Sequence, residues 1–200
     1  MKNIKDDVDE FTSEEFKCLN LTCKDLSDKV FDSCIFKDCD FNEAVLDRSK
    51  FIDCHFIQCN LSLIKIEQSK FLDVFFEECK VIGVDWTSAS WSNYTLSSPI
   101  KFYKSIINDS SFFGLRLEEI ELEECKAHDV DFREGNFSEA NFSYSDFTNC
   151  LFNKTNLTGV NFVEAINYNI DVYFNEITRA KFTRFEAIRL LDSLDVELVD

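Results

Sequence analysis

Nine cysteines are the side chains of this chain best suited to chemistry, as metal ligands, disulfide partners or nucleophiles. Seven of them share one position, two residues before an apolar residue: Cys34, Cys39, Cys54, Cys59, Cys79, Cys125 and Cys150. A free cysteine at a recurring inward position behaves as a small buried hydrophobe. We therefore expect these seven to be structural thiols rather than a metal or disulfide site, and we expect Cys18 and Cys23, which break the rule, to be exposed.

The two histidines are the next candidates for acid–base or metal chemistry. His55 directly precedes the apolar Phe56, and His128 directly follows Ala127, so both side chains are expected to point to solvent with no group converging on them. The sequence has no Gly-rich phosphate loop, no HExxH motif and no nucleophile elbow. We predict no catalytic residue, no cofactor and no metal site, and hence no enzyme.

Carboxylates dominate the charged residues, with 38 Asp and Glu against 21 Lys and Arg and a net charge of −17. This balance disfavours direct binding to nucleic acid or to an anionic membrane. The acidic N-terminal sequence MKNIKDDVDE does not resemble a secretory signal, and no apolar run reaches membrane-spanning length. We therefore expect a cytoplasmic protein.

The element that must position these side chains has a period of five. From Asp131 to Asn161, every fifth residue is Phe or, at position 157, Leu, with a small residue two positions earlier and usually Asp or Asn directly before. Five is neither the helical period of 3.6 nor the strand period of 2, and a short fixed repeat indicates a solenoid. The same frame runs from Phe16 to Leu96 and, after a slip of one residue, from Phe102 to Phe162. Sixteen of the 22 phenylalanines lie on its central positions, all of which are apolar.

The slip falls near residues 97–101, beside Pro99, and two interpretations stay open. It is either a bulge at a corner or the base of a protruding recognition loop. A single extra residue is small for a loop, which favours the bulge.

This pattern of a small residue, Asp or Asn, then Leu or Phe resembles the pentapeptide-repeat family. The resemblance implies an all-β solenoid, a right-handed quadrilateral β-helix in which each pentapeptide forms one side and the central residue and the one two before it point inward. We expect an irregular N-terminal segment at 1–15, the β-helix at 16–165, and a C-terminal cap at 166–200.

The cap is expected to contain a helix over about 184–194. Thr183 and Glu186 have capping-box spacing, with Phe182 in the staple position. One apolar face would carry Phe185, Ile188, Leu191 and Leu194, followed by a short strand at 196–199. This helix either only caps the solenoid or also pairs two subunits.

A four-sided frame allows charge to be assigned by side. Counted in steps of four pentapeptides, three adjoining sides have net charges of −5, −3 and −4, and the fourth is neutral. The candidate partner-binding face consists of the acids Glu77, Glu78, Glu118, Glu119, Glu139 and Asp146. An acidic rod of even width could occupy a basic groove built for duplex DNA.

The tail resembles that of the quinolone-resistance group of pentapeptide-repeat proteins, the Qnr, MfpA and McbG type, through Ala165, Tyr168, Ile170, Asp171, Asn175, Ile177, Ala180, Phe182, Leu190 and Leu191. That resemblance implies a homodimer that binds a type II topoisomerase, DNA gyrase or topoisomerase IV, by mimicking DNA. The alternative is a solenoid scaffold or regulator that binds another protein.

Overall fold

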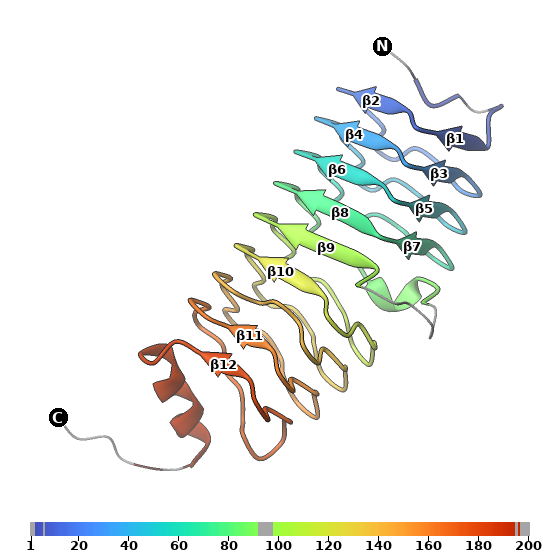
Figure 1. Cartoon of the computed structure of the whole chain (residues 1–200). Helices are drawn as coiled ribbons and strands as arrows, with labels where there is room; N and C mark the ends of the chain where they lie inside the picture. Colours follow the sequence, from blue (N-terminus) through green and yellow to red (C-terminus); the bar gives the residue numbers. More distant parts are fainter. Residues whose placement is uncertain (1–2, 6, 92–97, 195, 197–200) are drawn as a thin grey trace.

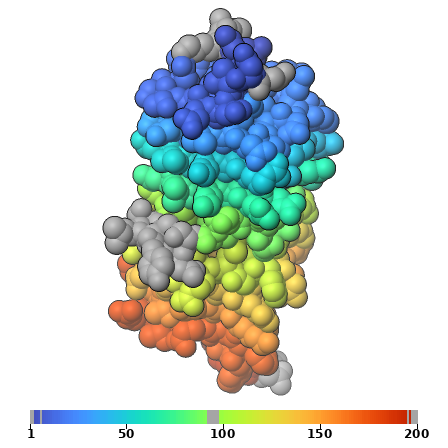
Figure 2. All heavy atoms as spheres, turned by 90° about the vertical axis from the view of Figure 1, so that its right-hand side faces the viewer, coloured from blue at the N-terminus to red at the C-terminus, as the bar shows by residue number. Residues whose placement is uncertain are grey.

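The computed structural model is a rod of stacked coils with the two chain ends at opposite ends of the rod (Figure 1), and it describes residues 3–5, 7–91, 98–194 and 196. Seen from the side, successive coils form bands of similar width (Figure 2). Among the described residues, no helix has both the length and the apolar character to cross a membrane.

The strands are short, and each forms part of one side of a coil. In chain order they are β1 (Glu10–Thr12), β2 (Glu15–Lys17), β3 (Val30–Asp32), β4 (Ile35–Lys37), β5 (Lys50–Ile52), β6 (His55–Ile57), β7 (Lys70–Leu72), β8 (Val74–Glu77), β9 (Ile100–Tyr103), β10 (Glu121–Glu123), β11 (Asn161–Phe162) and β12 (Lys181–Phe182). Two 3-10 helices, η1 (Trp86–Ser88) and η2 (Glu186–Leu194), complete the described elements.

All strand pairing is parallel and runs along the rod. One sheet has the order β1-β3-β5-β7, a second has the order β10-β9-β8-β6-β4-β2, and β11 pairs with β12. Isolated parallel bridges continue the stacking along the remaining sides. The structure thus confirms the predicted β-solenoid, with four sides to a coil.

We number the sides by the central residues that stack on each. Side 1 contains Phe11, Phe31, Phe51, Phe71, Trp91, Leu117, Phe137 and Leu157. Side 2 contains Phe16, Phe36, Phe56, Phe76, Phe102, Leu122, Phe142 and Phe162. Side 3 contains Leu21, Phe41, Leu61, Val81, Ile107, Ala127 and Phe147. Side 4 contains Leu26, Leu46, Ile66, Trp86, Phe112, Phe132 and Phe152.

The Asp or Asn before many central residues has a local role. Its side-chain oxygen accepts a hydrogen bond from the backbone N–H two residues later, as Asn60 does from Ser62 (3.2 Å) and Asp131 from Arg133 (3.1 Å). This Asx turn pre-forms the bend after each centre. The chain then turns through a residue with positive φ, such as Tyr144 at 58°. The Asp or Asn of a pentapeptide therefore specifies the corner, and its apolar central residue specifies the interior.

Every described central residue from Phe16 onward is buried except Trp91, which is half-buried. Phenylalanines form continuous ladders; on side 2 the Phe56 ring stacks between Phe36 at 4.6 Å and Phe76 at 5.1 Å. The seven frame cysteines are buried and free, whereas Cys18 and Cys23 are exposed, as predicted. Buried thiols donate to carbonyls of the preceding coil, as Cys54 does to Phe31 at 3.3 Å.

The frame slip is larger than the sequence indicated. Residues that pair between neighbouring coils are normally 20 apart, but 26 residues separate Cys79 from its partner Ser105, an excess of six. Phe102, not Leu96, therefore stacks on Phe76 on side 2. The one-residue bulge is wrong: the extra length is one pentapeptide plus one residue. Leu96 itself lies outside the described residues.

The coils also extend beyond both predicted boundaries. At the N-terminal end, β1 already pairs with β3, within the segment expected to be irregular. The buried Lys29 occupies an inward position there, and its ammonium donates to the Val8 carbonyl at 2.8 Å. At the other end, β12 pairs with β11 and Phe182 stacks on Phe162, so the coils continue to Phe182 rather than to about residue 165.

The C-terminal helix forms, but not as the capping box predicted. The Thr183 hydroxyl accepts from the Glu164 N–H (2.7 Å), and the Glu186 carboxylate accepts from the Arg189 guanidinium (2.7 Å). Both side chains are therefore engaged by other partners than those of a capping box. The segment is a 3-10 helix. The predicted strand at 196–199 lies almost wholly outside the described residues.

Candidate functional site

The larger insertion changes which acids share a side. Beyond the insertion, each pentapeptide lies one side earlier than the sequence count placed it. Counted over 14–164 with the observed stacking, side 2 has nine carboxylates and four lysines, and the net charges of sides 1 to 4 are −2, −5, −3 and −2. The predicted neutral side is therefore wrong; side 2 is the most acidic, and negative charge surrounds the rod.

The densest acids form what we call the acidic belt: Glu118, Glu119, Glu121, Glu123, Glu124 and Glu139. The first five follow one coil across side 2, from its corner with side 1 to its corner with side 3, because Leu122 is the buried centre between them. Glu139 lies on the next coil in the same column as Glu119. Three belt members, Glu121, Glu123 and Glu124, were absent from the predicted site, although the run EEIELEE already contained them.

Few cations neutralise the belt. Glu118 accepts a hydrogen bond from Asn136 at 2.7 Å and lies 3.5 Å from the Arg116 guanidinium. Glu124 lies 3.6 Å from the Lys104 ammonium, and Glu139 lies 3.4 Å from the Arg179 guanidinium. These pairs are solvent-exposed and contribute little to stability. Six carboxylates against three neighbouring cations leave the belt with a net negative charge.

Glu77 and Glu78 lie away from Glu118 and Glu119, at the corner of side 2 with side 3. Glu77 pairs in register with Tyr103, and the next residue in that column is Glu123. The predicted face is thus divided, with Glu118, Glu119 and Glu139 at one edge of side 2 and Glu77 and Glu78 at the other.

Asp146 lies on side 3 and is tied into the fold. Its carboxylate accepts from the Asn167 amide (2.9 Å) and from the Thr148 hydroxyl (2.7 Å), and it lies 2.9 Å from His128 Nε2. Partial burial alone would raise the pKa of Asp146, but these hydrogen bonds outweigh it and lower the pKa to about 2. Asp146 is thus held by three side chains of the fold, more than any carboxylate of the belt.

The histidines are less isolated than the sequence suggested. Both are half-buried, and each lies beside a carboxylate: His128 beside Asp146, and His55 3.0 Å from Glu77. Within the part of the chain that the structure describes, no group of three or more His, Cys, Asp or Glu could hold a metal ion. Burial raises the pKa of the Cys125 and Cys150 thiols to about 12, which disfavours the reactive thiolate.

The candidate dimer residues divide into two groups. Phe185 is 82% exposed and Ile188 is 49% exposed, whereas Leu191 and Leu194 are half-buried. Leu190, which the prediction did not place on the apolar face, packs against the core. Tyr173 and Phe174 are also exposed, at 72% and 59%. The cap therefore leaves aromatic side chains uncovered, a feature typical of association surfaces.

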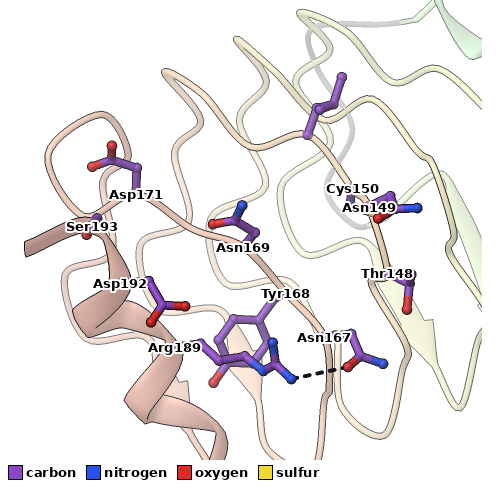
Figure 3. Close-up of a pocket in the computed structure, with 11 residues that line it drawn as sticks. Thr148, Asn149, Cys150, Asn167, Tyr168, Asn169, Asp171, Arg189, Asp192 and Ser193 are labelled. Atoms are coloured by element: carbon purple, nitrogen blue, oxygen red, sulfur yellow. Dashed lines mark hydrogen bonds between the residues drawn. The ribbon is translucent and has the colours of Figure 1, made fainter. Parts of the chain in front are cut away.

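A groove of about 860 Å³ separates η2 from the coil corners that precede it (Figure 3). Arg189 crosses it and donates to Asn167 at 3.3 Å, and Asn169, Asp171 and Asp192 also line it. The polar lining and the Arg189 contact make this groove the joint between the cap and the coils.

Comparison with known proteins identifies the repeat. A family model described as "Pentapeptide repeat region" matches residues 29–99 and 95–162. A comparison with curated proteins finds no match.

Solved structures give the closest view of the fold. A trypsin-treated variant of QnrB1, described as a plasmid-mediated fluoroquinolone resistance protein, superposes with a TM-score of 0.71 at 20% identity, covering 96% of this chain and 92% of that chain. Full-length QnrB1 gives a TM-score of 0.54 at 19% identity, covering 94% and 90%. HetL, a pentapeptide repeat protein of the cyanobacterium Nostoc, gives only 0.41 at 12% identity, covering 86% and 84%.

Proposed function

This chain belongs to the pentapeptide repeat family, and from that premise we propose that it is a non-enzymatic DNA mimic that binds a type II topoisomerase, DNA gyrase or topoisomerase IV. Binding would protect the enzyme from quinolone-like poisons or modulate it, and it would place the protein in the cytoplasm. The observation that carries the proposal is the acidic belt on a rod of even width.

The physical argument concerns the shape of the negative potential. Duplex DNA presents negative charge on all sides of a uniform rod, and a basic groove that binds it responds to that field rather than to base sequence. This rod has acid on all four sides, greatest on side 2. Such a field both speeds association with a basic groove and contributes to affinity.

The likeness to QnrB1 supports the same reading. It extends over nearly the whole of both chains, and QnrB1 is described as a fluoroquinolone resistance protein. The resemblance of the tail residues to that group is independent of the repeats.

We further propose that two copies associate through the exposed cap, with Phe185 and Ile188 at the interface. Two rods joined end to end would present a longer acidic surface to the enzyme. Phe185→Glu is the preferred test, because Phe185 is 82% exposed and its replacement leaves the coils undisturbed. Sedimentation should show monomers; persistent dimers would remove Phe185 from the interface.

The functional test is a gyrase supercoiling assay with and without a fluoroquinolone. Addition of the protein should restore supercoiling in the presence of the drug, or inhibit it without the drug. The paired reversal Glu118→Lys and Glu119→Lys should weaken the effect about ten-fold or more, because like charges would then meet across the interface.

A matched control is available on side 3. Asp109→Lys with Asp129→Lys makes the same charge change at exposed corner residues outside the belt. An equal loss in both double variants would mean that total charge, not the belt, governs binding. No effect of the wild-type protein on either topoisomerase would refute the proposal.

A further inference from the structure

Phe75 occupies a position that polar side chains usually fill. It directly precedes the buried centre Phe76, points outward from β8 and is half-buried. Its ring lies 4.8 Å from the His55 ring, and Ile35 continues the same column with 39% of its surface exposed. Side 2, the most acidic side of the rod, therefore has a strip of outward apolar and aromatic side chains.

His55 and Phe75 of this strip line a groove of about 380 Å³ near the corner between sides 1 and 2. Its lining includes Asp53, His55, Asp73, Phe75, Lys101 and Glu121. Asp53 and Asp73 are exposed corner residues of successive coils on side 1, and their carboxylates flank the aromatic floor. Three carboxylates against one lysine leave the groove negative.

A second outward phenylalanine shows what such an arrangement binds. Phe113, on side 4, has the Arg133 guanidinium 5.7 Å from its ring centroid. Asp131 holds that guanidinium through two hydrogen bonds of 2.9 and 2.7 Å. An aromatic face and a carboxylate together bind an arginine, through cation–π attraction and charge-assisted hydrogen bonds.

The groove at Phe75 has the ring and the carboxylates without the cation. Lys101 is paired in register with Phe75, but its ammonium lies 3.1 Å from the Asp73 carboxylate, and no cation–π contact to Phe75 occurs among the described residues. Asp53 makes one long hydrogen-bond contact, 3.5 Å from the Ser33 hydroxyl. The His55 ring lies beside the Phe75 ring, so the Asp53 carboxylate and the part of the Phe75 ring that His55 and Lys101 leave exposed are what the groove offers a ligand.

We propose that this groove receives an arginine side chain from the protein partner, with the guanidinium against the Phe75 ring and hydrogen-bonded to Asp53. Arginine fits better than lysine because its planar guanidinium both stacks on aromatic faces and binds a carboxylate bidentately. The identity of the partner as a topoisomerase rests on the proposed function; the chemistry of the groove does not. The groove adds a specific anchor to a surface otherwise recognised by its overall field.

Two experiments test the groove separately from the partner. In the first, isotopically labelled protein is titrated with the tripeptide acetyl-Gly-Arg-Gly-amide, and with the same peptide carrying neutral citrulline, while the ring signals of Phe75 and His55 are followed by NMR. Saturable shifts with arginine, on the order of millimolar affinity for so small a ligand, and their absence with citrulline are expected. Equal shifts with both peptides, or no shifts, would overturn the proposal.

In the second, the affinity for gyrase is measured for Phe75→Leu, Asp53→Asn and the control Asp109→Asn. Phe75→Leu keeps an apolar floor without a π face and should weaken binding about five-fold. Asp53→Asn should weaken it similarly, whereas Asp109→Asn, the same charge change at an equivalent corner of side 3, should change it less than two-fold. Wild-type binding in both groove variants would refute the groove and leave the proposed function standing. Arginine-dependent shifts without any gyrase binding would leave the groove standing and refute the proposed function.

Discussion

Replacing Phe56 by alanine tests the buried ladder on which the whole rod depends. Phe56 is 1% exposed and lies in the middle of the side 2 ladder. Its ring stacks on Phe36 and Phe76, with interplanar angles of 10° and 12°, and meets Phe41 edge-on at 5.7 Å. Truncation removes these contacts and leaves a cavity between coils that cannot collapse without breaking backbone pairing on both sides.

The expected cost follows from these contacts. Truncating a buried phenylalanine to alanine lowers the free energy of unfolding by about 3–5 kcal/mol. Aromatic pairs add about 0.5–1.5 kcal/mol each beyond buried area, which places Phe56→Ala near the top of that range, at about 5 kcal/mol. Phe56→Leu keeps most of the volume and should cost about 1–2 kcal/mol.

Phe113→Ala is the control, because Phe113 is a phenylalanine on the outer surface, 42% exposed. It loses part of its packing and the contact with Arg133, for an expected cost of about 1 kcal/mol. The three variants are compared by guanidinium unfolding at one protein concentration, followed by far-UV circular dichroism and tryptophan fluorescence. Coincident transitions with equal m-values are required, because repeat arrays can lose cooperativity.

The reasoning fails if Phe56→Ala costs no more than Phe113→Ala. Whether a phenylalanine points inward or outward would then not determine how much it contributes to stability, and the ladder would not be the main source of stability.

Three further predictions concern other parts of the rod. Of the nine thiols, only Cys18 and Cys23 should react with a thiol reagent in the native protein, and the other seven only on unfolding; a third fast thiol would contradict the buried assignment. Lys29→Met keeps the buried stem but loses the bond to the Val8 carbonyl, so it should cost about 1–2 kcal/mol and speed proteolysis of the N-terminal segment; an unchanged cleavage rate would argue against this cap. The folded pKa of Asp146, about 2, lies below its unfolded value of about 3.9, so its contribution to stability is complete above about pH 5 and is lost as pH falls through 2. Stability should therefore fall less between pH 6 and pH 2.5 in Asp146→Asn than in the wild-type protein, and equal falls would contradict the assignment.

The interior of the rod could be predicted from the sequence because its geometry is periodic. An apolar residue every fifth position, with a small residue two before it, leaves one way to bury both. The described central residues from Phe16 to Phe162 are buried, except Trp91, which is half-buried. The inward thiols follow from the same rule. Neither the burial of the central residues nor that of the thiols depends on how many residues separate stacked positions of neighbouring coils.

The assignment of sides could not be predicted, because a count in fives does not distinguish one extra residue from six. Leu96 is apolar and falls in frame, so it looked like a central residue. Only the stacking of Phe102 on Phe76 shows that six extra residues, not one, separate these two coils. That single difference moves Glu118 and Glu119 to the opposite edge of side 2 from Glu77, and it removes the predicted neutral side.

The prediction of a capping box in the C-terminal cap was wrong for a different reason. Thr183 and Glu186 have the spacing of a capping box, but a local pattern does not show competing partners. Glu164 and Arg189 provide those partners in the folded chain, and the helix adopts 3-10 geometry. The Phe75 groove could not be predicted from the sequence, because its residues come from different coils and become neighbours only through stacking.

Competition with DNA tests the central claim most directly. Labelled protein is bound to purified gyrase, and unlabelled duplex DNA is added at constant ionic strength. A DNA mimic must be displaced in proportion to the duplex added, with the Glu118→Lys and Glu119→Lys double variant displaced at lower DNA concentrations. Simultaneous binding of protein and duplex would contradict DNA mimicry and favour a scaffold that binds elsewhere on its partner.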